Sequence, residues 1–273
     1  MKISYSLTTW ITRIYRWTRR NLYETLRPKQ RTLRHIKYRN ADFVVLSNED
    51  VGWRLIRDKK FEEEEINCLE SYVEEDSVCI DVGANIGIYS IFLARKASKG
   101  CVHAFEPHPL NRKILQLNAE LNGRNNIEIH HFLVGNHEGM IDFSISSDLA
   151  YSSMIPTKRK AETDKIRLPC TTLDALFSHS KKRIDVIKID TEGAELLVLK
   201  GAELLLRNPA IRPRALLIEI NRENQIGYGY KAEDIRDFMM QNGYEPYSIV
   251  NGHTRKGWLL PNCKEDVIFL RKT

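Results

Sequence analysis

The chain has few of the features that mark secreted or membrane-spanning proteins. Among its 273 residues, five are cysteines, their number is odd, and no two of them form a C-x-x-C pair. We therefore expect reduced thiols rather than disulfides or zinc. No run of about eighteen apolar residues occurs, and no signal peptide is evident. These absences predict a cytoplasmic protein without a membrane span.

Acidic residues are nearly absent from the N-terminus. Residues 1–40 contain eleven Lys or Arg and one acid, Glu24, so this segment carries +10 and the rest of the chain −4. Apolar side chains between Trp10 and Trp17 recur at spacings of three and four, which predicts a basic amphipathic helical arm. Two roles stay open for the arm: peripheral contact with an anionic inner membrane surface, or packing on the body with a solvated basic face.

The rest of the chain is typical of an α/β protein, because short apolar runs alternate with helical patterns. We divide the whole chain into a basic arm (1–40), a hairpin and helix (41–76) and an α/β domain (77–273). The hairpin lies within 41–60, with a strand at 43–46, and a helix covers 61–75. We expect strands at 78–80, 102–105, 127–134, 139–146, 169–171, 186–189 and 215–220, and a loop at 147–165. Helices are expected at 87–97, 109–122, 173–177, 194–207 and 231–242. A final pair, 247–250 and 267–270, would add an antiparallel strand.

A glycine loop, Asp81–Gly87 (DVGANIG), joins the strand at 78–80 to a helix. Its glycines follow G-x-x-x-G, whereas a dinucleotide site needs G-x-G-x-x-G and a P-loop needs Gly-Lys-Ser/Thr. Gly83 and Gly87 let the backbone approach a ligand. Asp81 would repel a pyrophosphate but attract the cationic groups of S-adenosylmethionine, and Asn85 offers an amide to its methionine part. The loop therefore predicts S-adenosylmethionine as the cofactor.

A second acid, Glu106, ends the next strand, 23 residues after Gly83. An acid at this place accepts hydrogen bonds from ribose hydroxyls. Pro107 then turns the chain, and we include it among the cofactor-binding residues. Gly135 follows the third strand, where the adenine would lie.

Acidic residues gather again after the strand at 186–189. Asp190 and Glu192 reach the same sheet edge as Asp81, and Glu195 lies one turn into the next helix. Methyl transfer to a hydroxyl needs a group that removes the proton, and a carboxylate can do so. We take these three as catalytic candidates, with Asp190 and Glu192 first.

The following strand brings Glu219 and Asn221 to a neighbouring position. A divalent metal bound by Asp190, Glu219 and Asn221 is the alternative to a general base. A core ion pair or a capping role also stays open for Glu195 and Glu219. Ser152 and Ser153, in a loop that could close over the cleft, are expected to contact the substrate together with Glu219.

Taken together, these motifs resemble the FkbM-type methyltransferase family. The shared features, in order, are DVGANIG, Glu106–Pro109, Asn118, Ser152-Ser153, Leu173-Asp174, Ile187–Glu195, Leu199–Ala202 and Glu219. The resemblance implies a class I Rossmann-like methyltransferase fold over 77–273, with a mostly parallel seven-stranded sheet and an antiparallel terminal strand. It also implies O-methylation of a hydroxyl on a sugar, glycan or other natural product.

Two other classes of protein are alternatives to a methyltransferase. A nicotinamide-dependent oxidoreductase is disfavoured by the missing third glycine and by Asp81. A non-catalytic module could keep the cofactor fold and use the basic arm for a membrane or nucleic acid, but Lys and Arg do not interleave with aromatic residues over the body, so nucleic acid is not expected. An Asn/Asp-Pro-Pro-aromatic motif for amino acceptors is missing, which favours a hydroxyl.

Overall fold

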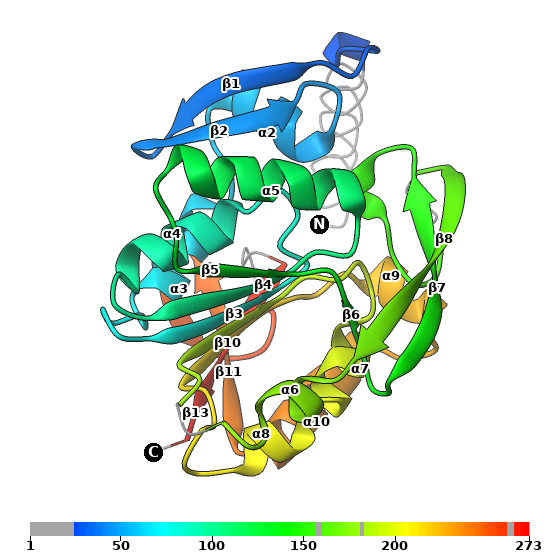
Figure 1. The fold of residues 1–273 in the computed structure, drawn as a ribbon. Coiled ribbons are helices and arrows are strands. Elements are labelled where there is room, and N and C mark those ends of the chain that lie inside the picture. The colour runs from blue at the N-terminus through cyan, green and yellow to red at the C-terminus, as the bar shows by residue number, and fades with distance from the viewer. Residues whose placement is uncertain (1–24, 157–159, 181–182, 261–264, 273) are drawn as a thin grey trace, which may run out of the picture.

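The computed structural model describes residues 25–156, 160–180, 183–260 and 265–272. Its centre is an eight-stranded sheet in the order β12-β11-β13-β10-β9-β3-β4-β5 (Figure 1). The strands are β3 (Val78–Val82), β4 (Cys101–Phe105), β5 (Ile127–His130), β9 (Val186–Ile189), β10 (Ala215–Glu219), β11 (Tyr244–Val250), β12 (His253–Lys256) and β13 (Asp266–Arg271).

Five neighbouring strands, from β10 to β5, run parallel, and β13 is antiparallel to both β10 and β11. The predicted sheet, mostly parallel with one antiparallel strand near its end, is therefore confirmed. β12 extends it beyond seven strands as a hairpin partner of β11. The chain runs outward from β3 in one direction and returns at β9 on its other side, so the strand order switches between β3 and β9. Ligands of such sheets bind at the carboxyl ends of the strands next to this switch point.

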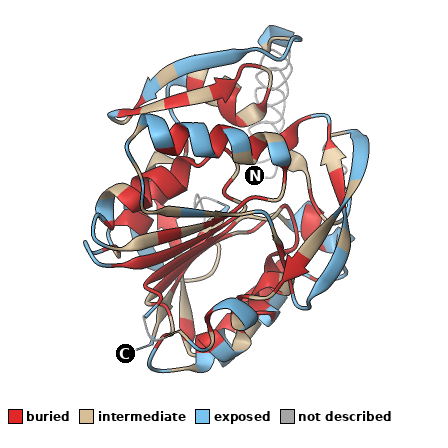
Figure 2. Ribbon diagram, in the orientation of Figure 1, coloured by how far each residue is buried: buried red, intermediate tan, exposed pale blue. Residues whose placement is uncertain are grey.

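Helices cover both faces of the sheet (Figures 1 and 2). One face packs on α3 (Glu63–Glu70) and α4 (Ile88–Lys96), where Leu69 and Phe92 are fully buried; α5 (Pro109–Leu121) flanks the same side. The other face packs on α6 (Leu173–Phe177), α7 (Glu195–Lys200), α8 (Glu203–Arg207) and α10 (Ala232–Gln241). Successive strand residues alternate between the two cores, as a sheet buried on both faces requires.

The N-terminal hairpin differs from the prediction. β2 (Ala41–Leu46) contains the expected strand, but its partner, β1 (Leu33–Tyr38), precedes it, so the arm's boundary at residue 40 falls in the turn. Arg39 and Asn40 form that turn with φ of 48° and 61°. β1 escaped prediction because charged residues occupy its exposed face. α2 (Asp50–Asp58) then takes the place of the expected second strand.

The basic segment is partly built into the fold. Arg31 pairs with Glu49 at 2.7 Å, Arg39 pairs with Glu70 at 2.9 Å, and Arg27 pairs with an acid of a later loop. The helix predicted around Trp10–Trp17 lies outside the described residues. Within the described ranges, no helix has the length and apolar character needed to cross a membrane.

A smaller sheet, β6-β8-β7, stands beside the main one (Figure 1). The strand expected at 127–134 is split between β5 and β6 (Leu133–Val134), which belong to different sheets. β7 (Gly139–Ser146) pairs with β8 (Glu162–Thr171), so the expected loop is shorter and the short strand at 169–171 is the end of a long one. The helix expected at 194–207 is broken at Gly201, and α9 (Arg222–Gly227) was not expected.

Asn118 of α5 joins the hairpin to the central domain. Its buried side chain accepts from the backbone N of Val44 at 2.6 Å and donates to the carbonyls of Val44 at 3.1 Å and Ile86 at 2.9 Å. One amide thus connects β2, α5 and the glycine loop.

We expect Asn118→Ala to lower the free energy of unfolding by about 1–3 kcal/mol, because it leaves buried backbone groups without partners. Urea unfolding measures this loss. Gln116→Ala, on the exposed face of the same helix, is the control and should change stability far less. Equal stability of both variants would contradict the role of Asn118.

Candidate active site

A cavity opens at the carboxyl ends of β3, β4, β9 and β10. Its walls enclose about 1120 Å³, counting the open mouth. The sheet forms its floor, and α2, the start of α3 and the loop after β7 close it. The lining comprises residues 50, 51, 54, 61, 62, 82–86, 88, 89, 105–107, 111, 132–134, 143, 149–154, 188, 190–192, 194 and 219.

The glycine loop is held tightly at the floor. The backbone N of Gly83 and of Ala84 both donate to the carbonyl of Phe105 at 3.0 Å. Gly83 has φ +81°, and a Cβ there would lie 1.8 Å from the carbonyl oxygen of Asp190. Gly87 has φ +88° and precedes α4, while Asn85 has φ +51°. The loop thus exposes backbone to the cavity at Gly83–Ile86, which fits the predicted contact with a cofactor.

Glu106 lines the cavity beside this loop. Its Oε2 accepts from the backbone N of Asn85 and its Oε1 from that of His108, each at 2.8 Å. Each carboxylate oxygen retains a second lone pair, so both can still accept from a diol. Burial raises the pKa of Glu106 to about 8. Pro107 lines the same wall, and this geometry fits the predicted ribose contact.

Asp81 is placed differently from the prediction. It is fully buried below the loop, outside the cavity lining, and its Oδ2 accepts from Ser90 Oγ at 2.6 Å. It lies opposite Lys188 in the register of β3 and β9. Burial raises the pKa of Asp81, while Lys188 and Ser90 act to lower it. Asp81 therefore faces Ser90 and Lys188 rather than the cavity.

Three carboxylates come together on the opposite side of the cavity. One oxygen each of Asp190, Glu192 and Glu219 lies within 4.8 Å of the others. Lys188 Nζ pairs with Asp190 at 2.9 Å, and Asn224 donates to Glu192 at 2.6 Å. No described residue donates a hydrogen bond to the buried Oε2 of Glu219. Burial, reinforced by Asp190 and Glu192, raises the pKa of Glu219 well above its ordinary value.

Two predicted members of this cluster lie behind it. Glu195 is fully buried, and its Oε1 accepts from the backbone N of Thr191 at 3.1 Å and of Gly193 at 2.9 Å. It organises the turn that presents Asp190 and does not line the cavity. Asn221 caps α9 by accepting from the backbone N of Asn224 at 3.2 Å, so its side chain is occupied away from the carboxylates.

Gly135 also lies beyond the cavity. A Cβ at Gly201 would lie 1.9 Å from the Gly135 carbonyl oxygen, so the two glycines allow β6 and α7 to pack closely. Phe132, Leu133 and Val134 line the cavity instead. The residues that line the cavity after the third strand therefore lie one to three positions before the predicted Gly135.

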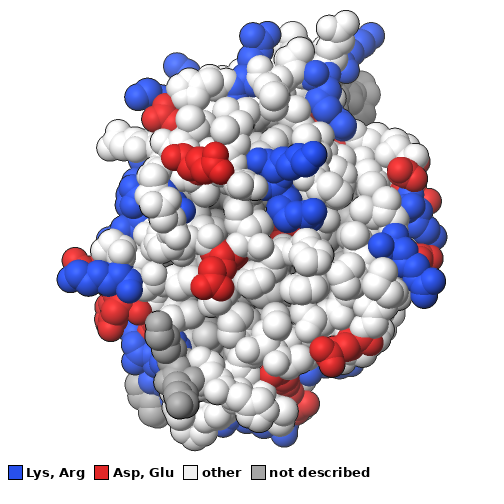
Figure 3. Space-filling model, in the orientation of Figure 1, with Lys and Arg blue, Asp and Glu red and all other residues white. Residues whose placement is uncertain are grey.

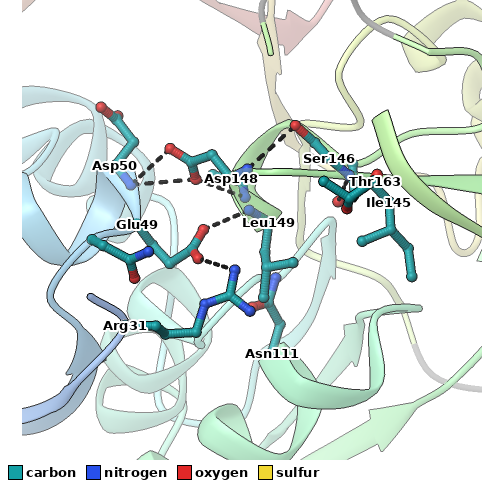
Figure 4. Close-up of polar contacts among 12 residues, drawn as sticks. Arg31, Glu49, Asp50, Asn111, Ile145, Ser146, Asp148, Leu149 and Thr163 are labelled. Atoms are coloured by element: carbon teal, nitrogen blue, oxygen red, sulfur yellow. Dashed lines mark hydrogen bonds and ion pairs between the residues drawn. The ribbon is translucent and has the colours of Figure 1, made fainter. Parts of the chain in front are cut away.

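Ser152 and Ser153 line the cavity from the loop after β7. The loop is fixed by mutual capping with α2 (Figure 4). Asp148 accepts from the backbone N of Asp50 at 3.1 Å, and Glu49 accepts from that of Leu149 at 2.5 Å. Burial and Asp148 raise the pKa of Glu49 to about 7. Glu49 precedes α2, and Asp148 precedes a short 3-10 helix, η1 (Leu149–Tyr151). The first backbone N of each helix thus donates to the acid that precedes the other helix.

Sequence reasoning missed several lining residues. Lys188 is one of them, and its ammonium lies 4.7 Å from the ring centre of Tyr89. Tyr89 in turn donates to Glu62 at 3.1 Å. Arg54 lines the outer wall and pairs with Glu62 at 3.2 Å. Lys188 could have been found from the sequence, because it interrupts an otherwise apolar strand. Tyr89, Glu62 and Arg54 follow no such pattern.

The sequence matches the family described as "Methyltransferase FkbM domain" over residues 81–246. Hexuronic acid methyltransferase AglP of Haloferax volcanii is 33% identical over 162 residues, 59% of this chain and 64% of AglP. Methyltransferase 1 of Beauveria bassiana is 24% identical over 148 residues, 47% of this chain and 59% of that protein. The chain therefore covers less than two thirds of either relative. Among solved structures, M. jannaschii TYW2 in complex with AdoMet has 16% identity and a TM-score of 0.44, with 90% and 89% of the two chains covered.

The fold and the cavity at its switch point are those of the Rossmann-like methyltransferase class. Because the family match covers more than half of the chain, the chain belongs to the FkbM methyltransferase family. The predicted fold class and family are confirmed, and the family match agrees with the predicted cofactor, S-adenosylmethionine.

We expect S-adenosylhomocysteine to bind Glu106→Gln about ten- to a hundredfold more weakly than the wild type, because hydrogen bonds to a charged acceptor are lost. The raised pKa of Glu106 adds a pH dependence. Below about pH 8 the free protein holds the carboxyl protonated, so wild-type affinity should rise between pH 7 and 8.5.

Calorimetry at three pH values measures both effects. Asp81→Asn is the matched comparison, since Asp81 is buried outside the cavity, and it should reduce affinity less than Glu106→Gln. A pH profile of Glu106→Gln that rises as steeply as that of the wild type would contradict the assignment.

Proposed function

We propose that this enzyme methylates a hydroxyl group of a glycan or related natural product. The observation that carries the proposal is the cluster of Asp190, Glu192 and Glu219 across the cavity from Glu106. Bound S-adenosylmethionine supplies an electrophilic methyl group, and a neutral hydroxyl must lose its proton as it attacks. A carboxylate cluster at the chemical end of the cavity supports that step.

Glu219 is the member best suited to take the proton. Asp190 is engaged by the ammonium of Lys188, and Glu192 by the amide of Asn224. Glu219 is half-buried, its Oε2 is buried, and its raised pKa makes its ionised form a stronger base than an ordinary carboxylate. We therefore assign Glu219 as general base, and Asp190 and Glu192 as residues that bind the acceptor. Glu195 supports them from behind.

The acceptor class is supported by the relative AglP, whose name describes a hexuronic acid methyltransferase. Ser152 and Ser153 line the cavity and would lie beside the acceptor, although Ser152 Oγ also accepts from the backbone N of Ser146 at 3.1 Å and Ser153 Oγ donates to the carbonyl of Ile155. On the face drawn in Figure 3, Lys and Arg are interspersed with Asp and Glu rather than gathered in a stripe. That pattern favours a small or glycan acceptor over nucleic acid.

We expect Glu219→Gln to lose turnover by about a hundredfold or more while S-adenosylhomocysteine affinity stays unchanged. The assay follows S-adenosylhomocysteine release with oligosaccharides that do or do not contain hexuronic acid. Glu223→Gln, an exposed neighbour on α9, is the control and should retain activity. Full turnover in Glu219→Gln would remove its role as base.

Divalent metal is the other chemistry open to the same carboxylates. With Glu219 as base, turnover should persist in EDTA. Loss of turnover in EDTA that magnesium restores would instead favour a cation held by Asp190 and Glu219, with Glu192 in the place expected for Asn221.

A further inference from the structure

A second group of metal-binding side chains lies on strands β4 and β5. Cys101 and His103 form a C-x-H pattern on β4, and Glu128 and His130 form an E-x-H pattern on β5. The strands are parallel, with His103 opposite Glu128. Because side chains alternate along a strand, all four residues share one face of the sheet. Cys101 begins β4, at the end of that strand away from the cavity.

The donor atoms of this group are close together. Cys101 Sγ lies 3.5 Å from Glu128 Oε1, and His103 Nδ1 lies 3.3 Å from Glu128 Oε2. One donor each of these three residues lies within 4.8 Å of the others. A tetrahedral zinc ion with bonds of about 2.0–2.3 Å spaces its ligands by roughly 3.3–3.8 Å. The group thus already has close to the spacing of a zinc coordination sphere.

A fourth donor, His130, lies beside His103 but outside the set of three whose donor atoms are all within 4.8 Å of one another. His130 Nε2 lies 3.2 Å from His103 Nδ1. The ring of His103 packs edge-on against Phe177 at 4.9 Å, and that of His130 stacks on Phe105 at 4.5 Å, which fixes both imidazoles. Burial lowers the pKa of His130. The Glu128 side chain is 61% exposed and leaves an entry path.

We propose, against the expectation from cysteine spacing alone, that Cys101, His103 and Glu128, with His130 as the fourth ligand, bind a zinc ion that joins β4 to the edge strand β5. Without a cation, the Cys101 thiol must share a proton with the Glu128 carboxylate, and the two imidazoles must share one with each other. A zinc ion would replace these hydrogen bonds with metal–ligand bonds to all four groups. The site is separate from the cavity carboxylates and does not depend on the acceptor of methyl transfer.

Cobalt titration of the full-length, EDTA-treated protein tests the site. We expect one equivalent of Co²⁺ to give a tetrahedral d–d spectrum and a thiolate-to-metal charge-transfer band. Cys101→Ser should abolish the charge-transfer band, and His103→Gln should weaken binding by at least about tenfold. Cys170→Ser, His253→Gln and Asp190→Asn are controls and should keep the band.

Thermal unfolding gives an independent readout. Zinc should raise the Tm of the wild type, since it binds the folded state, and should leave Glu128→Gln unchanged. Glu128 is exposed, so this variant should fold normally. A wild type without a thiolate band, or a band that survives in Cys101→Ser, would overturn the proposal.

Discussion

The site depends on how closely the ends of three strands meet at Gly83. A side chain there would collide with the carbonyl oxygen of Asp190, and the amides of Gly83 and Ala84 share one acceptor, the carbonyl of Phe105. The carboxyl ends of β3, β4 and β9 therefore converge on one loop. Glu106 follows β4 directly and Asp190 follows β9 directly, so both reach the same cavity from strands that flank β3. A residue with a Cβ at position 83 would force the strand ends apart and separate the cofactor wall from the chemical wall.

Convergence brings many carboxylates into a small volume, and Lys188 is the main buried compensation. It lies opposite Asp81 in the sheet and pairs with Asp190. Burial alone would lower the pKa of Lys188, but Asp190 and Asp81 outweigh it and raise the pKa above its ordinary value. The ammonium of Lys188 thus compensates the charge of an acid on β3 and of an acid that follows β9. The cluster of Asp190, Glu192 and Glu219 still favours a cationic ligand over a pyrophosphate, which agrees with the cofactor predicted from the glycine loop.

Features that depend on a residue's position along the chain could be predicted from the sequence. The direction in which a side chain points could not. The parallel strands, the glycine loop and Glu106 were predictable, because hydrophobic period and strand-end acids place them at one sheet edge. Glu195 and Asn221 have the right residue type at the right edge, yet each turns back to cap its own helix or loop. No spacing rule distinguishes an acid that points into a cavity from one that holds the turn below it. β1 was missed for a different reason, since an exposed strand with charged residues lacks an apolar signal.

The outer wall of the cavity and its floor are formed by different parts of the chain. The family match begins at residue 81, but Asp50, Arg54 and Glu62 line the cavity from the N-terminal segment. The capping exchange between Glu49 and Asp148 fixes this segment to the loop that carries Ser152 and Ser153. The wall formed by the glycine loop and Glu106 therefore lies within the family match, and the wall around Ser152 and Ser153 is built where that domain meets an N-terminal segment outside the match. Because α2 lies outside residues 81–246 and the loop after β7 lies inside them, this wall of the cavity joins a segment outside the family match to one within it.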